Sequence, residues 1–317
     1  MRIITDNEIR DLHITPTECV EWVKEAFLMK ERCVLPPKIS IHPQRTDFIN
    51  TMPCLLPEEY HRFGCKVVSR INGSEPSLKS NLMLFDSSTG DMLAVVECNW
   101  ITAMRTGAVA ALSIETLKNK EAKVFSFIGL GVIGNAVLDC LLATLPKKAY
   151  TFRLFRYKNH AEKVIERLSE QYDYVKFEIA DTIGQWASGS DVIVSSITDA
   201  KGLIVEDLSL FKPGVLVVPV HTRGFQNCDT YFDKVIADDR GHVEGFKYFN
   251  DFRQFIEFNN ILSGITKGRD NKKEQILVYN IGLGLHDVLF ATKIMNKLKS
   301  IRGGVFNCIS VSYKTAA

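Results

Sequence analysis

The chain has 317 residues, of which 46% are hydrophobic and 24% charged, with a formal net charge of +2. That length allows two domains, and the near-neutral charge without a basic tract gives no indication of a nucleic-acid or membrane partner. The apolar runs fall far short of the ~20 residues that a membrane-spanning helix needs. The acidic N-terminus lacks an apolar signal core, and the eight scattered cysteines lack metal-ligand spacing. We therefore predict a cytoplasmic protein with reduced, mostly buried thiols and no metal site.

The first third of the chain predicts a sheet with helices and carries no nucleotide-binding motif. Its predicted elements are a helix capped by Thr17, an extended segment from Pro36-Pro37 through Ile41, strands over 63–71, 82–85 and 92–96 with a hairpin turn at 86–91, and a helix over 100–117.

From Lys123 the pattern changes to strands alternating with helices. Strands are predicted over 124–128, 152–155, 175–178, 191–195, 215–220 and 234–238, with helices after Asn135 and over 161–172. Such alternation predicts a parallel, doubly wound sheet. The tail from Gly284 is again helical and is expected to return to the first unit. The predicted domains are therefore residues 1–118 with 288–317, and residues 119–287.

A glycine motif, Gly129-x-Gly131-x-x-Gly134, follows the first of these strands directly and opens a helix. In a dinucleotide-binding fold the first glycine permits a tight turn, the second lets the backbone approach a pyrophosphate, and the third lets the helix pack closely. The helix N-terminus then faces the phosphates. We predict that these glycines bind the cofactor together with the intervening Val132 and Ile133. The alternative is a tight turn without a ligand.

The end of the second strand normally presents an acid, about 20 residues past the glycines, that binds the ribose of NAD. Here that place holds Arg156, and no acid follows until Glu162. Arg156 and Lys158 suit a 2′-phosphate, because a guanidinium binds phosphate in bidentate fashion. This pattern favours NADP over NAD. The alternative is a solvated strand end.

Three segments resemble a known family. Residues 94–110 read AVVECNWITAMRTGAVA and are similar to the pattern A-l-l-D-g-x-x-L-T-a-x-R-T-a-A of the ornithine cyclodeaminase/mu-crystallin family. Residues 84–90, LFDSSTG, match that family's l-x-D-x-x-T-G hairpin, and residues 282–291, GLGLHDVLFA, resemble its G-x-a-x-x-D-l-x-x-A helix. The resemblance covers nearly the whole chain, in order, with the glycine motif between.

The resemblance implies an α/β protein in which a Rossmann domain is joined to a discontinuous α+β domain for substrate binding and dimerisation. It also implies a homodimer. Arg105 takes the place of the family's substrate-carboxylate arginine and Lys66 that of its substrate-binding lysine, which we also count as a catalytic candidate. Met52-Pro53 fits the family's turn at that place.

The residues themselves give a second view of these two cations. Arg105 lies among small apolar residues, where an unpaired charge is costly, so it needs an anionic partner. A structural pairing with Glu97 is the alternative to a substrate carboxylate. Lys66 lies in an otherwise apolar strand, where a lysine more often marks an edge than a ligand site.

The chain departs from the family pattern at two places. Lys38 stands where many members have arginine, which keeps the charge but loses the bidentate geometry. In the loop after the fifth strand, the acid that handles amine protons in cyclodeaminases falls near Gly224 by ungapped counting, while Asp229 matches a later glutamate. His221, at the strand's carboxyl end, is our candidate replacement, because its usual pKa suits proton transfer. The alternative is a hydrogen-bonded loop histidine. His286 is expected on a helix surface.

Loss of the loop acid favours net oxidoreduction over redox-neutral cyclodeamination. We therefore predict an NAD(P)-dependent dehydrogenase or reductase acting at the α-carbon of an amino or imino acid, with the cations holding the carboxylate. Two alternatives stay open at this point: ornithine cyclodeaminase itself, which converts ornithine to proline and ammonia, and a mu-crystallin-like protein that binds NADPH and a small molecule.

Overall fold

The structure is a computed structural model that describes residues 1–44, 47–198 and 200–301. The chain forms two compact units. Unit 1 comprises Met1–Glu18, Met29–Arg105 and the chain from Leu283 on, and unit 2 comprises Cys19–Leu28 and Thr106–Gly282. One boundary between the two units thus falls after Arg105, inside a helix. The domain limits at residues 118 and 288 stay a prediction.

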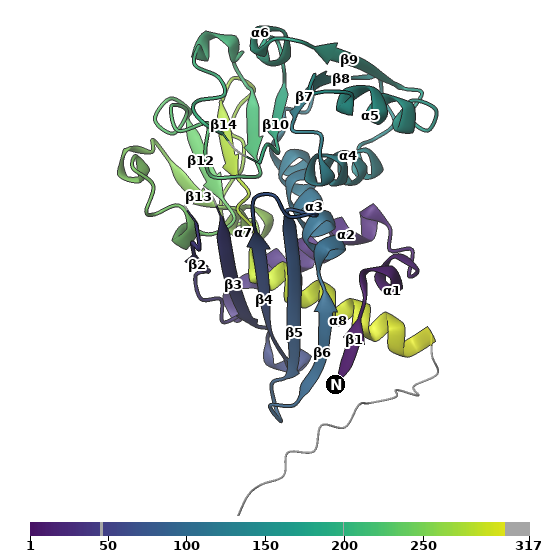
Figure 1. Cartoon of the computed structure of the whole chain (residues 1–317). Coiled ribbons are helices and arrows are strands. Elements are labelled where there is room, and N and C mark those ends of the chain that lie inside the picture. Colours follow the sequence, from purple (N-terminus) through teal and green to yellow (C-terminus); the bar gives the residue numbers. More distant parts are fainter. Residues whose placement is uncertain (45–46, 199, 302–317) are drawn as a thin grey trace, which may run out of the picture. The chain divides into compact units, whose positions relative to one another are not determined.

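Unit 1 is built on a six-stranded mixed sheet with the strand order β1-β6-β5-β4-β3-β2 (Figure 1). The strands are β1 (Arg2–Ile4), β2 (Ile39–Ile41), β3 (Phe48–Leu55), β4 (Arg62–Arg70), β5 (Leu78–Asp86) and β6 (Met92–Glu97). All neighbours are antiparallel except β1 and β6. The C-terminal helix α8 (Gly284–Ile301) packs against β3, β4 and β5. A Cβ atom at Gly64 would lie 2.8 Å from Val288, so the missing side chain lets this helix approach the sheet.

The three strands predicted in this unit are confirmed as β4, β5 and β6, whereas β1 and β3 were not predicted. The predicted turn at Met52-Pro53 is wrong, because both residues lie within β3. A proline is tolerated there since the pairing of β2 with β3 ends at Thr51, so that among the described residues no strand pairs with Pro53 on that side.

Besides α8, three α-helices begin in unit 1: α1 (Asp6–Arg10), α2 (Pro16–Met29) and α3 (Asn99–Leu117). The predicted cap of α2, Thr17, lies two residues after the observed one. Thr15 rather than Thr17 accepts the backbone N–H of Glu18, and the Glu18 carboxylate accepts the backbone N–H of Thr15 in return. This reciprocal pair is a capping box, which satisfies two otherwise unpaired donors.

Unit 2 is built on an eight-stranded sheet with the order β13-β12-β14-β11-β10-β7-β8-β9, in which every neighbouring pair is parallel. The strands are β7 (Val124–Ile128), β8 (Tyr150–Phe155), β9 (Val175–Ala180), β10 (Val192–Ser195), β11 (Leu216–Pro219), β12 (Lys234–Ala237), β13 (Phe255–Glu257) and β14 (Ile276–Tyr279), with helices α4 (Val132–Thr144), α5 (His160–Leu168), α6 (Ile183–Ala187) and α7 (Phe258–Leu262). The doubly wound α/β prediction is confirmed.

The strand order reverses at β7. The chain runs from β7 outward through β8 to β9, and then returns to β10 on the other side of β7. Ligands of open α/β sheets bind at the carboxyl ends of the strands beside such a reversal. The loops that follow β7, β10 and β11 therefore form the part of unit 2 where a ligand site is expected.

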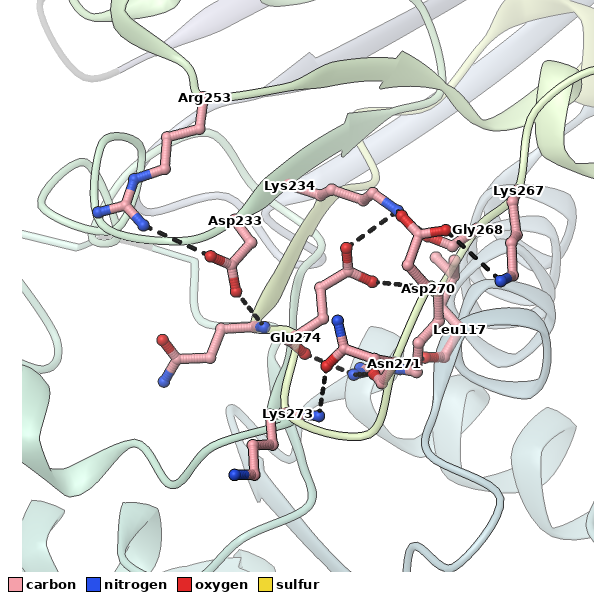
Figure 2. A network of polar contacts seen from close by, with 12 residues as sticks. Leu117, Asp233, Lys234, Arg253, Lys267, Gly268, Asp270, Asn271, Lys273 and Glu274 are labelled. Atoms are coloured by element: carbon pink, nitrogen blue, oxygen red, sulfur yellow. Dashed lines mark hydrogen bonds and ion pairs between the residues drawn. The ribbon is translucent and has the colours of Figure 1, made fainter.

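The sequence missed β13 and β14, which are three and four residues long. β14 is nevertheless fully buried between β11 and β12. Its preceding loop is held at the amino end of β12 by a polar network around Lys234 (Figure 2). The Nζ atom of this buried lysine lies 2.6 Å from Asp270, 3.0 Å from Glu274 and 3.0 Å from the carbonyl oxygen of Gly268.

Among the described residues, no helix is long and apolar enough to cross a membrane. The seven cysteines in that part of the chain are free thiols, and five of them are buried, as predicted. Cys308 lies outside the described residues.

Candidate functional site

A cluster of three buried charged side chains lies in unit 1 and brings together two of the predicted site residues. Lys66 projects from β4, Arg105 from α3 and Asp287 from the first turn of α8, and their exposed fractions are 0%, 6% and 0%. The Nζ atom of Lys66 lies 2.7 Å from one carboxylate oxygen of Asp287, and Nε of Arg105 donates to the other oxygen at 3.2 Å. Asp287 thus separates two cations that would otherwise repel each other.

The charge of this cluster is unbalanced, since two cations share one carboxylate. Asp287 is the one anionic partner of Lys66 Nζ among the described residues, and it is shared with Arg105. Burial first, and then the charge of Arg105, lower the pKa of Lys66 to about 8, while Asp287 opposes that shift. Two buried cations that share a single carboxylate are costly, and an anionic ligand would relieve that cost.

The surroundings of this cluster correct two expectations, on Lys66 and His286, and replace the alternative partner of Arg105. Lys66 is fully buried in a central strand rather than at an edge. Arg105 pairs with Asp287, whereas the carboxylate of Glu97 accepts the backbone N–H of Asp6. His286 is buried rather than on the helix surface, because α8 is covered along most of its length.

Lys38 lies just before β2, the edge strand two positions away from β4, and it is half-buried. Asp287 was not among the predicted site residues, although its place in the helix motif was noticed. The sequence signal for Asp287 was an acid next to the apolar run 288–291, because a charge on the buried face of a helix needs a partner of opposite charge.

The three glycines of the loop after β7 in unit 2 are present for different physical reasons. Gly129 has a φ of +88°, and a Cβ atom there would lie 2.5 Å from the backbone of Ser196. At Gly134 a Cβ atom would lie 2.3 Å from the carbonyl oxygen of Gly129, so the start of α4 packs directly on the turn. A Cβ atom at Gly131 would meet no atom of the described residues within 4 Å. The first and third glycines are therefore required by the protein itself, while the second faces open space.

Gly131 is also the N-cap of α4, and it has no side chain to accept the N–H groups of the first turn. These groups, with the partial positive charge of the helix end, suit a phosphate. Val132, next in the chain, is 75% exposed. This loop therefore fits a dinucleotide on observations independent of the sequence motif.

Arg156 follows β8 and is already paired. Its guanidinium donates to Glu162 and, at 2.5 Å, to Asp181, which follows β9. Asp181 is the acid that the sequence pattern did not reveal at this edge, because it comes from the neighbouring strand. Lys158 has a positive φ of 50°, and its Nζ lies 5.5 Å from the ring centroid of Tyr157.

His221 is joined to a serine at the carboxyl edge of the sheet. Its Nε2 atom lies 2.6 Å from Oγ of Ser195, the last residue of β10. The imidazole also stacks on Phe225, at 6.2 Å between ring centroids. Burial lowers the pKa of His221 to about 4, against a smaller opposing influence of the Arg223 backbone. The imidazole is thus neutral at neutral pH, which removes the expectation that it titrates in that range.

The two loop positions that were matched to acids of the family pattern have structural roles. Gly224 has a φ of +98°, and a Cβ atom there would lie 2.7 Å from Ile204, so this position disfavours any side chain. Asp229 is buried, and its Oδ1 atom accepts a hydrogen bond of 2.6 Å from the Tyr279 hydroxyl. Burial raises the pKa of Asp229 to about 6, and the hydrogen bond from Tyr279 opposes that shift.

Two curated relatives are similar to most of this chain. The nodulation efficiency protein NfeD of Rhizobium meliloti is 27% identical over 273 residues, which cover 82% of this chain and 83% of that protein. A Delta(1)-pyrroline-2-carboxylate reductase of Bacillus thuringiensis subsp. konkukian is 25% identical over 335 residues, which cover 98% and 99%.

Two solved structures share the fold. The Delta(1)-pyrroline-2-carboxylate reductase of Thermococcus litoralis, solved with NADH and L-proline, has a TM-score of 0.84 at 23% identity and covers 97% of this chain and 100% of its own. An archaeal alanine dehydrogenase dimer with bound NAD has a TM-score of 0.83 at 20% identity and covers 98% and 99%. The model of the ornithine cyclodeaminase/mu-crystallin family matches residues 2–302. The chain belongs to the ornithine cyclodeaminase/mu-crystallin family.

Proposed function

We propose that this protein is an NAD(P)-dependent oxidoreductase that acts at the α-carbon of a small amino or imino acid. The observation that carries the proposal is the buried cluster of Lys66, Arg105 and Asp287, in which two cations share one carboxylate. Such a cluster lacks one negative charge, which an α-carboxylate supplies. An arginine and a lysine together also provide several donors for that group.

The nucleotide is held in this proposal by unit 2. The N–H groups of the first turn of α4 bind the pyrophosphate, and Gly131 leaves the space for it. When bound, the nicotinamide gives or takes the hydride of the reaction. The relatives solved with NADH and NAD support this class of cofactor.

The preference for NADP is a finer part of the proposal and rests on Arg156 and Lys158. Arg156 would have to exchange Glu162 or Asp181 for a 2′-phosphate. Its side chain is 44% exposed, and ion pairs at such positions contribute only about 0–1 kcal/mol, so the exchange costs little. A lower Kd for NADPH than for NADH would support this preference, and a lower Kd for NADH would overturn it.

A homodimer, cytoplasmic location and an amino or imino acid substrate complete the proposal, and one of the similar structures is a dimer. The first experiment is a survey of amino acids and of 2-oxo acids with amines, in which NAD(P)H absorbance is followed. Net oxidation or reduction with at least one of these compounds is expected. Proline and ammonia formed from ornithine without net cofactor consumption would instead establish a cyclodeaminase, and tight NADPH binding without any turnover would indicate a binding protein.

The pH dependence tests the role of Lys66. Because its pKa is lowered to about 8, Lys66 is mostly protonated at pH 7 and loses its charge as the pH rises through 8. We expect kcat/KM for the substrate to fall above about pH 8, since this quantity reports on the free enzyme. Lys66→Met should remove that limb of the profile and raise KM.

The matched control for this experiment is Lys79→Met, which changes an exposed lysine of the adjacent strand β5. This variant should leave the profile unchanged. An unaltered high-pH limb in Lys66→Met would contradict the assignment of Lys66.

A further inference from the structure

Ser195 lies at a central position of the sheet edge in unit 2. It ends β10, and its register partners are Ile128 of β7 and Pro219 of β11. The following residue, Ser196, donates its hydroxyl proton to the carbonyl oxygen of Gly129 at 2.7 Å. The same strand end therefore contacts the glycine loop on one side and the loop of His221 on the other.

The backbone fixes the serine beside the histidine. The N–H of Val220 donates to the carbonyl oxygen of Ser195 at 2.9 Å, which extends the strand pairing by one residue beyond β11. His221 follows directly, and its Nε2 lies 2.6 Å from Ser195 Oγ. Ser195 is fully buried, and in the described part of the chain its hydroxyl has no other partner.

A buried hydroxyl that makes a single hydrogen bond acts as the donor in it, because an unpaired buried donor is less well tolerated than an unused acceptor lone pair. If Ser195 donates to Nε2, this nitrogen carries the lone pair and the imidazole proton is on Nδ1. Nδ1 is buried and meets no hydrogen-bond criterion within residues 1–44, 47–198 and 200–301, but the backbone of Arg223 acts on the ring as an acceptor, which favours the proton on Nδ1.

We propose that Ser195 is a positioning residue whose hydroxyl donates to Nε2 of His221 and so holds the imidazole proton on Nδ1. His221 then presents a neutral N–H donor to a ligand instead of acting as a base. The role of this Ser195–His221 pair in turnover rests on the proposed function. The acceptor would be a lone pair of the substrate or nucleotide, such as an imine nitrogen or a carboxamide oxygen.

The first experiment needs no substrate. In protein labelled with ¹⁵N-histidine and free of ligands, the signals of the seven histidines are recorded between pH 6 and 8, and His221→Asn identifies the signal of His221. We expect the Nδ1–H tautomer. Ser195→Ala should shift it towards the Nε2–H form, while Ser195→Thr, which keeps a hydroxyl, should retain the original tautomer.

The matched control is Ser126→Ala, which removes another fully buried serine hydroxyl of the same sheet, bonded at 2.7 Å to Ser190. It should leave the signal of His221 unchanged. An Nε2–H tautomer in the unmodified protein, or an unchanged signal in Ser195→Ala, would overturn the proposal. Should Ser195→Ala fail to fold, Ser195→Cys, with its weaker donor, replaces it and should show the same shift in part.

The second experiment uses turnover with whichever amino or imino acid is active. Ser195→Ala should lower kcat at least ten-fold, with the Kd of NAD(P)H changed less than two-fold, and Ser195→Thr should restore most of kcat. Equal kcat in Ser195→Ala and the unmodified protein would reject the role in turnover. If no compound is turned over at all, the proposed function fails, while the tautomer measurement still decides whether Ser195 positions His221.

Discussion

At the scale of single residues, similar side chains in this protein have opposite reasons for being where they are. Gly129 and Gly134 are glycines because any Cβ would collide with the backbone, whereas the space at Gly131 is open. Among the buried cations, Lys234 has two carboxylates and a carbonyl around it, while Lys66 shares one carboxylate with Arg105. We therefore expect a ligand at Gly131, where the space is open, and at Lys66, where the positive charge is not fully compensated.

Gly131 provides the residue-scale test of the nucleotide site. Its φ of −83° is open to any residue, and an N-cap change costs about 1 kcal/mol or less, so Gly131→Ala should fold with nearly unchanged stability. The added methyl group should obstruct the approach of a pyrophosphate, and we expect the Kd of NAD(P)H, measured by titration calorimetry, to rise at least ten-fold.

Gly184→Ala, at another unobstructed glycine in α6, is the control and should change neither property. Unchanged affinity in Gly131→Ala would argue against a pyrophosphate at this loop.

At the scale of elements, short strands depend on interactions outside themselves. β14 has four residues, yet it is buried between two neighbours and needs its register fixed. The loop before it does so through Lys234, with Glu274 as the buried partner and Asp270 as the half-exposed one (Figure 2). The N–H of Asp270 also donates to the Glu274 carboxylate, which closes the loop.

Lys234→Met should destabilise unit 2, because it leaves the Glu274 carboxylate buried without its cation. Breaking one partner of a buried ion pair costs about 3–5 kcal/mol, which urea unfolding would measure as a lower midpoint. The double variant Lys234→Met/Glu274→Gln should recover part of that loss.

Lys267→Ala removes an exposed contact of the same network, with Nζ 3.6 Å from Asp270, and should cost less than about 1 kcal/mol. An equal loss in Lys267→Ala and Lys234→Met would contradict the central role of Lys234.

At the scale of the whole molecule, the two units carry different parts of the proposed chemistry. Unit 1 holds the cationic cluster, and unit 2 holds the glycine loop and the pair Ser195–His221. The nucleotide should therefore protect residues of unit 2, and the carboxylate ligand residues of unit 1.

Hydrogen exchange can locate the two ligands. NADPH alone should slow exchange in the glycine loop and the first turn of α4, since those amides gain phosphate partners. L-Proline, as a probe with one carboxylate, should act in unit 1, near Arg105 and the start of α8. Arg105→Gln should abolish the second effect and keep the first. Protection by L-proline that survives in Arg105→Gln would refute the carboxylate assignment.

What the sequence determined by itself was local. Hydrophobic runs predicted the strands β4 to β12, because a buried strand must be apolar whatever covers it. The glycine motif was readable because turn, close approach and helix start are consecutive in the chain. β13 and β14 were not predicted, and length alone does not explain this, because β10, β11 and β12 are as short as β14.

Tertiary structure decided which groups meet and which charges are balanced. Asp287 lies 182 residues from Arg105, and Asp181 reaches Arg156 from the next strand, so neither pairing was visible as a spacing. Lys66 looked like an edge residue until α8 and the neighbouring strands buried it, and the same burial lowered its pKa. His221 was found by its place after a strand, but its neutral state follows from desolvation and its partner Ser195. Periodicity in the sequence shows that a face of an element is buried, but only the packing shows which groups lie against it. The pKa of a buried group and its interactions with other charges depend on those neighbours.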